Sequence, residues 1–132
     1  MPVRPHLALT LAAALAASPA AATPPDSVAG IWHVQRLFPQ DQLHGVAIMI
    51  TFTADGHVSG HGGCNRFAGS FTQTRDQLAF GTIAATKMAC PAPQMTAEAA
   101  FFLALSQVTH ADLHEGILTL SGREGPLMAA RR

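Results

Sequence analysis

Two histidines and a cysteine carry the nitrogen and sulfur donors that zinc prefers, namely His57, His61 and Cys64. In an extended strand, four residues separate the Cα atoms of His57 and His61 by about 13 Å, and Cys64 falls on the opposite face. Each ligand must reach to within about 2 Å of the ion. We therefore expect exposed polar side chains and predict no metal and no cofactor, unless a bulge at the intervening glycines draws the three together.

Other combinations of polar residues give little support for catalysis. His110 and His114 have the same spacing in a second predicted strand, with Asp112 on the same face as a hydrogen-bond partner. Ser70 lies in a predicted strand, and the chain contains no Gly-x-Ser-x-Gly turn. Eight scattered carboxylates define no glycosidase pair. We predict that the protein is not an enzyme and has no catalytic residues.

Asn65 and Arg66 are the weak candidates for a binding site. Asparagine tolerates positive φ, so Asn65 suits a turn or bulge after Gly62 and Gly63. The Arg66 guanidinium can bond main-chain carbonyls at a barrel end or pair with Glu98 of a following helix. We expect a structural role for both residues, and binding of an anion or another ligand is the alternative.

The beginning of the chain has the three-part organisation of a secretory signal peptide. A short basic stretch precedes the apolar residues 7–17, and Ala20-Ala21-Ala22 fits the Ala-x-Ala cleavage pattern. The apolar run is shorter than the roughly 20 residues that span a bilayer. We predict a signal peptide over residues 1–22, cleaved after Ala22 or Ala20, and hence a periplasmic or secreted protein.

Cys64 and Cys90 would then both enter an oxidising compartment. An even number of cysteines favours a disulfide there. In the chain-entropy model, closing a loop of about 27 residues stabilises a fold by roughly 3–4 kcal/mol. Free thiols or a metal site with further ligands are the alternatives.

The composition bounds the size of the fold and the class of its partners. The chain has 132 residues, with eight basic and eight acidic side chains and a formal net charge of zero. This length allows one domain, and the charge gives no electrostatic affinity for nucleic acid. We predict a flexible, proline-containing lead over residues 23–29 and one domain over residues 30–130.

Alternating apolar and polar residues predict short strands. The clearest covers residues 46–53, whose apolar side chains recur at every second position. Asp55-Gly56 then suits a two-residue hairpin turn with positive φ at both positions. The return strand, residues 57–64, contains three glycines, which predict close backbone approach, a bulge or a barrel corner. Further strands are predicted near residues 31–38, 67–72, 78–90, 108–114, 117–121 and 127–130.

One helix is predicted over residues 93–107, where Pro93 suits the first turn. Seven or eight antiparallel strands and one helix predict a mainly β (α+β) fold. We expect a small antiparallel β-barrel-like or strongly rolled sheet with the helix packed against it. The stripe expected to face the core at helical spacing consists of Met95, Ala99, Phe102 and Leu105 or Ser106. The aromatic side chains expected in the core are Trp32, Phe67, Phe71, Phe80 and Phe102.

Residues 62–71 read Gly-Gly-Cys-Asn-Arg-Phe-Ala-Gly-Ser-Phe, and residues 86–91 read Thr-Lys-Met-Ala-Cys-Pro. These segments and their order closely resemble the META domain family, which includes HslJ-like heat-shock-inducible bacterial envelope proteins. The resemblance covers about residues 28–130 and implies an antiparallel β-barrel-like domain with one packed helix. It also implies an association with envelope stress and novobiocin resistance, and it implies no catalytic residues.

We therefore predict a non-catalytic protein that supports the envelope stress response or antibiotic tolerance by binding. Its partner would be an envelope protein or a small ligand, with no nucleic acid and no membrane span, and the protein would be a monomer. The absence of a lipobox cysteine indicates release in soluble form. The alternative is a secreted calycin-like ligand carrier or inhibitor of the protease or lysozyme inhibitor type, with residues 23–29 as the inhibitory segment.

Overall fold

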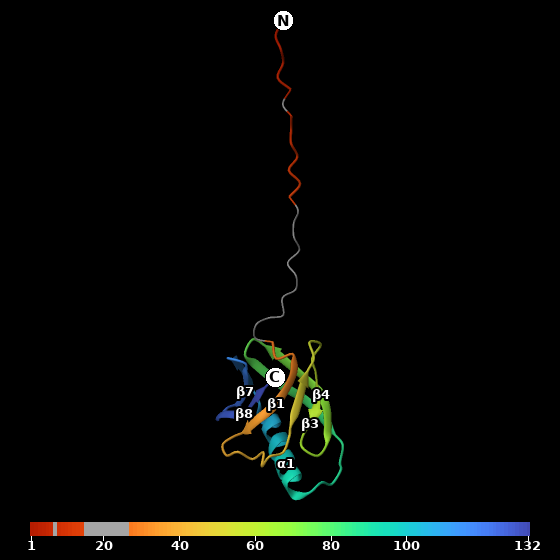
Figure 1. Ribbon diagram of the computed structural model, residues 1–132, viewed down its shortest axis with the longest axis vertical. Coiled ribbons are helices and arrows are strands. Elements are labelled where there is room, and N and C mark those ends of the chain that lie inside the picture. Colours follow the sequence, from red (N-terminus) through yellow and green to blue (C-terminus); the bar gives the residue numbers. More distant parts are fainter. Residues whose placement is uncertain (7, 15–26) are drawn as a thin grey trace.

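The computed structural model describes residues 1–6, 8–14 and 27–132, and residues 30–131 form a closed eight-stranded antiparallel barrel with one helix (Figure 1). This architecture confirms the predicted fold class. The predicted cleavage sites and residues 23–26 of the predicted lead fall outside the described residues, whereas residues 27–29 are described and Val28 is buried. The described part of the predicted signal peptide is exposed and contains neither helix nor strand. In the described part of the chain, no helix is long and apolar enough to cross a membrane.

Consecutive strands pair antiparallel in sequence order, and pairing of the last strand with the first closes the barrel. The alternation of buried and exposed side chains within each strand explains why the sequence pattern located most of them. The strands are β1 (Gly30–Leu37), β2 (Met49–Phe52), β3 (His57–His61), β4 (Arg66–Thr74), β5 (Gln77–Ala85), β6 (His110–His114), β7 (Ile117–Gly122) and β8 (Gly125–Arg131), and the helix α1 covers Ala92–Gln107.

The β2–β3 hairpin confirms one detail of the sequence analysis and corrects another. A Cβ at Gly60 would lie 2.0 Å from the Met49 carbonyl oxygen, so the predicted close backbone approach occurs there. Gly56 has a φ of 89°, but Asp55 does not have the predicted positive φ. Hydrogen bonds of the Thr53 side chain to the Asp55 carboxylate and the His57 backbone shape this turn instead.

Strand β5 is shorter than predicted and is poorly joined to the next strand. It ends at Ala85 rather than at residue 90. Its ladder with β6 consists of the pair Gln77 and His110, supported by a hydrogen bond from the Leu78 N–H to the Thr109 carbonyl. From Ala79 onward, no described strand pairs with β5 on this side, and α1 lies there instead. The barrel is therefore closed at one end of the β5–β6 seam, and an opening lined by β5 and α1 remains beyond it.

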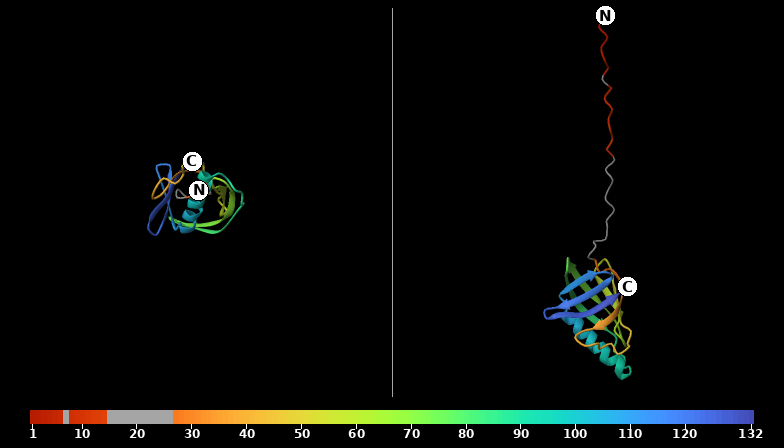
Figure 2. Two further views of the ribbon diagram at one scale, coloured as in Figure 1. Left: turned by 90° about the horizontal axis from the view of Figure 1, so that it is seen from below. Right: turned by 60° about the vertical axis from the view of Figure 1, so that its left-hand side comes forward.

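Helix α1 lies across one end of the barrel, within the ring of strands in the end-on view of Figure 2. It comes closest to β1 and β8, which leaves space on the β5 side. The predicted core stripe is only partly right, because Leu105 is buried and Phe102 packs against the core, whereas Met95, Ala99 and Ser106 are exposed. The helix is rotated so that Glu98 points inward to hydrogen-bond partners, and small alanines on the same face allow close packing. The buried residues are Ala97, Glu98, Phe101, Ala104 and Leu105.

The core is built around aromatic rings, as the sequence predicts. Trp32 is fully buried, and its indole N–H donates to the Val28 carbonyl oxygen at 2.8 Å. Phe67 is buried, and its ring centroid lies 5.4 Å from that of Phe101, a core residue that the sequence analysis left out. The remaining predicted aromatics, Phe71, Phe80 and Phe102, are half-buried and pack against this core.

Candidate binding site

A disulfide joins Cys64 to Cys90, with 5.9 Å between their Cα atoms. The bond confirms the predicted pairing and excludes free thiols and thiolate metal ligands. Cys64 lies in the β3–β4 connection, and Cys90 lies near the end of the segment that links β5 to α1. We call residues 86–91 the lip. The disulfide fixes one end of the lip to the barrel.

The Glu98 carboxylate accepts three hydrogen bonds from the β3–β4 connection. Its Oε2 accepts from the N–H groups of Cys64 at 2.8 Å and Asn65 at 2.6 Å, and its Oε1 accepts from the Asn65 side-chain amide at 2.6 Å. Glu98 is buried, so each of these donors would lose its partner if the carboxylate were removed. The carboxylate thus holds the β3–β4 connection against α1.

The Asn65 side chain extends the same network to the lip. Its Oδ1 accepts hydrogen bonds from the Met88 N–H at 2.6 Å and from the Thr86 hydroxyl at 3.0 Å. Its amide nitrogen also donates to the Met88 carbonyl at 3.3 Å. Asn65 does not have the predicted positive φ. Its structural importance comes from the amide, which bridges the helix and the lip.

The pKa of Glu98 lies below its ordinary value of 4.5. Burial is the largest influence and acts in the opposite direction, because it disfavours the charged form. The hydrogen bonds from the Asn65 side chain and from the Asn65 and Cys64 N–H groups together outweigh burial, with a smaller contribution from the charge of His61. Glu98 is therefore an anion at neutral pH, with most of its acceptor capacity already used.

The structure does not bring Arg66 to Glu98, so the expectation of that ion pair is wrong. Alternation along β4 places Phe67 inside the barrel and Arg66 outside, whereas Glu98 points inward. The Arg66 backbone bonds the lip through Thr86, N–H to Oγ1 at 3.2 Å and carbonyl to N–H at 3.0 Å. Its guanidinium makes no hydrogen bond or ion pair with any described residue.

The histidines that were considered as metal ligands do not form a shared site, and three of them make separate contacts with neighbouring residues. The His57 Nδ1 lies 3.1 Å from an Asp55 carboxylate oxygen, and the His61 Nδ1 accepts from the Gly63 N–H at 3.3 Å. Within residues 1–6, 8–14 and 27–132, no three histidine, cysteine or acidic side chains are grouped to hold a metal ion. His110 contacts the Thr109 hydroxyl rather than the expected aspartate.

The opening between β5 and α1 is a groove of about 700 Å³, which we call the β5–α1 groove. Its lining is mostly apolar. The lip closes one end, where Asn65 and Glu98 also border it. The residues that line the groove come from β5, the lip and α1 and do not recur at a regular spacing in the sequence. The sequence analysis therefore missed the groove. The principal apolar residues are Phe80, Ile83 and Ala85 of β5, Met95, Phe102 and Leu105 of α1, and Met88 and Ala89 of the lip.

The edge of the groove at the lip carries flexible methionine side chains and one positive charge. Met88 is 56% exposed and Met95 is 39% exposed, so two flexible thioether side chains flank the entrance. Lys87 lies between the groove and solvent. Among the described lining residues, Lys87 carries the one charge that is not already held in hydrogen bonds.

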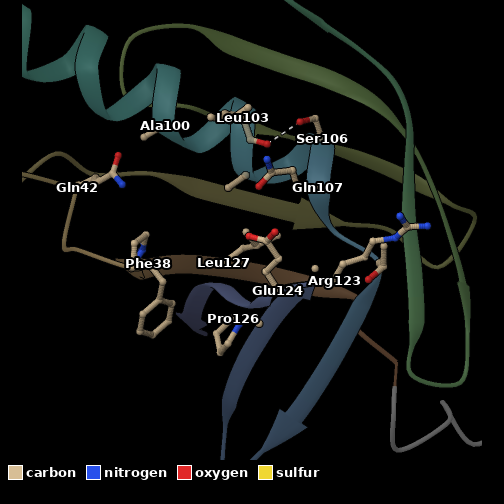
Figure 3. A pocket seen from close by; sticks show the side chains of 15 residues that line it. Phe38, Gln42, Ala100, Leu103, Ser106, Gln107, Arg123, Glu124, Pro126 and Leu127 are labelled. Atoms are coloured by element: carbon tan, nitrogen blue, oxygen red, sulfur yellow. Dashed lines mark hydrogen bonds between the residues drawn. The ribbon is translucent and has the colours of Figure 1, made fainter.

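A second hollow, of about 880 Å³, lies on another side of α1 (Figure 3). Leu103 and Ser106 border it from the helix, and Glu124 and Leu127 border it from the β7–β8 hairpin. Neighbouring Arg123 brings the opposite charge to Glu124, so this hollow has no charge preference. Two of its lining residues are joined by a backbone hydrogen bond, in which the Phe38 N–H donates to the Leu127 carbonyl at 2.9 Å. The β5–α1 groove is therefore the stronger candidate site.

The fold and the site define a small disulfide-linked β-barrel with a groove in its wall. The sequence profile of the META domain family matches residues 26–132, and the chain belongs to this family. No curated protein matches the sequence significantly.

Solved structures share the barrel. An NMR structure of a protein from Burkholderia xenovorans has 26% identity and a TM-score of 0.63, over 78% of this chain and 81% of the other. A second protein solved by NMR has 20% identity and a TM-score of 0.60, over 77% and 87%. A DUF4847 family protein from Bacteroides vulgatus has 16% identity and a TM-score of 0.57, over 77% and 90%. The last two are similar in fold alone.

Proposed function

We propose that this META domain protein is a non-catalytic binding protein outside the cytoplasm, of the HslJ-like type, which supports envelope integrity under heat or antibiotic stress. The observation that carries the proposal is the β5–α1 groove. Binding sites in small proteins are typically concave, mostly apolar and bordered by a few fixed polar groups. The groove has this character, and the disulfide and the Glu98–Asn65 network hold its lip in place.

The expected location outside the cytoplasm has two supports. The disulfide between Cys64 and Cys90 fits an oxidising compartment. The sequence of residues 1–22 has the pattern of a cleaved signal peptide. Both features are consistent with a periplasmic or secreted protein.

The environments of the acidic groups favour binding over catalysis. A general acid or base works best when its pKa lies near the working pH. Glu98, which borders the groove, has its pKa lowered instead. The pKa of exposed Asp55 is lowered to about 2, chiefly by the Thr53 hydroxyl and then by His57. Both carboxylates are therefore held in the charged form, away from the range that proton transfer needs.

The proposal is tested in bacterial cells that lack their own META protein. The full chain is expressed as wild type or as Ala85→Trp, a substitution that fills the groove at an exposed β5 residue. Ala84→Trp is the matched control, because Ala84 is the exposed neighbour that does not line the groove. We expect processed protein in the periplasm. Cells should survive heat or novobiocin with wild type and with Ala84→Trp, and should lose this protection with Ala85→Trp. Equal survival with empty vector would contradict the proposal.

A second candidate function is the carriage of an apolar small molecule, the carrier form of the calycin-like alternative. The volume of the groove favours it, since about 700 Å³ lies within the usual range for small-molecule sites. Solvent extraction of the purified protein followed by mass spectrometry tests this candidate. A molecule that copurifies with wild type and not with Ala85→Trp would support carriage, and an empty extract from both would count against it.

A further inference from the structure

The β5–α1 groove contains an unpaired strand edge. Residues 79–85 of β5 pair with β4 on one side, and no described strand pairs with them on the other. An unpaired edge presents backbone N–H and C=O groups that can template another strand. At about 3.3 Å per residue, this edge is about 23 Å long. It is long enough to pair with a segment of about six residues.

The wall opposite this edge is apolar. Met95, Phe102 and Leu105 of α1 face the groove, and Phe80 and Ile83 line it from β5. Helix α1 has its main strand contacts with β1 and β8, and the groove lies between α1 and β5. The groove thus offers hydrogen-bonding groups along one side and apolar surface along the other.

The chemistry of these two walls favours an extended peptide over a hydrocarbon chain as the occupant. A hydrocarbon chain would cover the β5 edge without pairing its polar groups, which costs free energy for each buried N–H or C=O left unsatisfied. An extended peptide satisfies the edge with its own backbone and inserts alternate side chains against α1. The peptide is therefore the better physical match.

The charge at the lip gives the peptide a preferred composition. Lys87 is exposed at this end of the groove. Glu98 is also there, but three N–H donors already engage its carboxylate. An acidic side chain on the peptide near the lip would therefore meet an available cation.

We propose that the edge of β5 binds an extended segment of a partner protein, with alternating apolar side chains in the groove and an acidic residue beside Lys87. This inference rests on the proposed binding function and names the partner class for that site. The segment would add as a strand between β5 and α1, at the place where the barrel wall is open.

The test uses the processed, oxidised protein and a synthetic library of capped hexapeptides. Each peptide alternates apolar residues with threonine and carries Asp at one end, and matched peptides carry Lys at that end. For each binder, a control peptide is N-methylated at alternate residues, which removes the donors for strand pairing and keeps the side chains. Affinity is measured by fluorescence polarisation, and the binding site by amide chemical shifts.

We expect Asp-containing peptides to bind, with amide shifts along residues 79–85 and α1. N-methylation in the pairing register and Ala85→Trp should each weaken binding by about tenfold or more, whereas Ala84→Trp should leave it nearly unchanged. Lys87→Glu should reverse the preference between Asp-containing and Lys-containing peptides. The inference would be overturned if peptides N-methylated at either set of alternate residues bound as tightly as the unmodified peptide. It would also be overturned if Ala84→Trp and Ala85→Trp weakened peptide binding equally.

Three further outcomes separate this inference from the proposed function. If no peptide of the library binds and Ala85→Trp still abolishes protection in cells, the peptide assignment is wrong and the binding function stands. If palmitate binds in the groove and peptides do not, the occupant is a small amphiphile. If peptides bind as expected but cells show no protection, the surface is confirmed and the proposed cellular function is wrong.

Discussion

The Glu98 carboxylate on α1 accepts a hydrogen bond of 2.6 Å from the side-chain amide of Asn65, and that amide also holds the backbone of Met88. One asparagine therefore connects the helix, the β3–β4 connection and the lip of the groove. The disulfide from Cys64 to Cys90 closes the same region covalently. The arrangement makes the stability of the fold and the shape of the groove depend on the same few residues.

Removal of the Glu98 side chain should strongly destabilise the protein. Glu98→Ala leaves three buried N–H donors without an acceptor, and we expect a loss of about 2–4 kcal/mol in the free energy of unfolding. Glu98→Gln should cost less, because one carbonyl oxygen remains to accept. Glu124→Ala, at an exposed position, is the control and should change the free energy by less than about 0.5 kcal/mol. Urea denaturation measures all three, and equal stability of Glu98→Ala and Glu124→Ala would refute the network.

The contribution of Glu98 should depend on pH with a defined sign. Its pKa in the folded protein is lowered from 4.5, so the charged form is favoured in the folded state. The resulting stabilisation is fully present above about pH 4.5 and is lost as the pH falls through the lowered pKa. The difference in unfolding free energy between wild type and Glu98→Gln should therefore shrink as the pH falls below about 4.5. A difference that grew on acidification would mean that the pKa of Glu98 is raised.

Asn65 and Arg66 should differ sharply in their effects on stability, although they are adjacent. Asn65→Ala removes the bonds to Glu98 and to the lip and should cost about 2–3 kcal/mol. Arg66→Ala should cost less than about 0.5 kcal/mol, because its exposed guanidinium contacts no described polar group. Thermal melts of both variants test this, and a large loss of stability with Arg66→Ala would show a role for its side chain that the structure does not explain.

The sequence pattern predicted the barrel well because most of its strands have one buried face and one exposed face. Ile48, Ile50 and Phe52 illustrate this, since all three are buried at every second position. Successive side chains of a strand point to opposite faces. Because the core lies on one side of each strand, apolar residues recur at every second position and mark the strand in the sequence.

The orientation of the helix and the groove could not be predicted in the same way. Glu98 is a buried charge on an apolar face, and a stripe drawn from apolar residues alone excludes it. Its burial depends on partners in the β3–β4 connection, more than 30 residues earlier in the chain. The opening beside β5 similarly reflects how far the β5–β6 ladder extends, which is a property of the closed barrel and not of either strand.

Reduction of the disulfide should destabilise the protein and loosen the lip. The bridge spans a sequence separation of 26 residues, and in the chain-entropy model its loss costs roughly 3–4 kcal/mol. A loss of this size is a large part of the stability of a small domain. The oxidised protein should show no titratable thiol after denaturation, and the Cys64→Ala/Cys90→Ala variant should melt at a lower temperature. In that variant, hydrogen exchange at the Met88 amide should speed up more than at buried β7 residues such as Leu118 and Leu120, because the lip then keeps only its hydrogen bonds to Asn65 and to the Arg66 backbone. Uniform acceleration across the barrel would show instead that the bridge acts only on global stability.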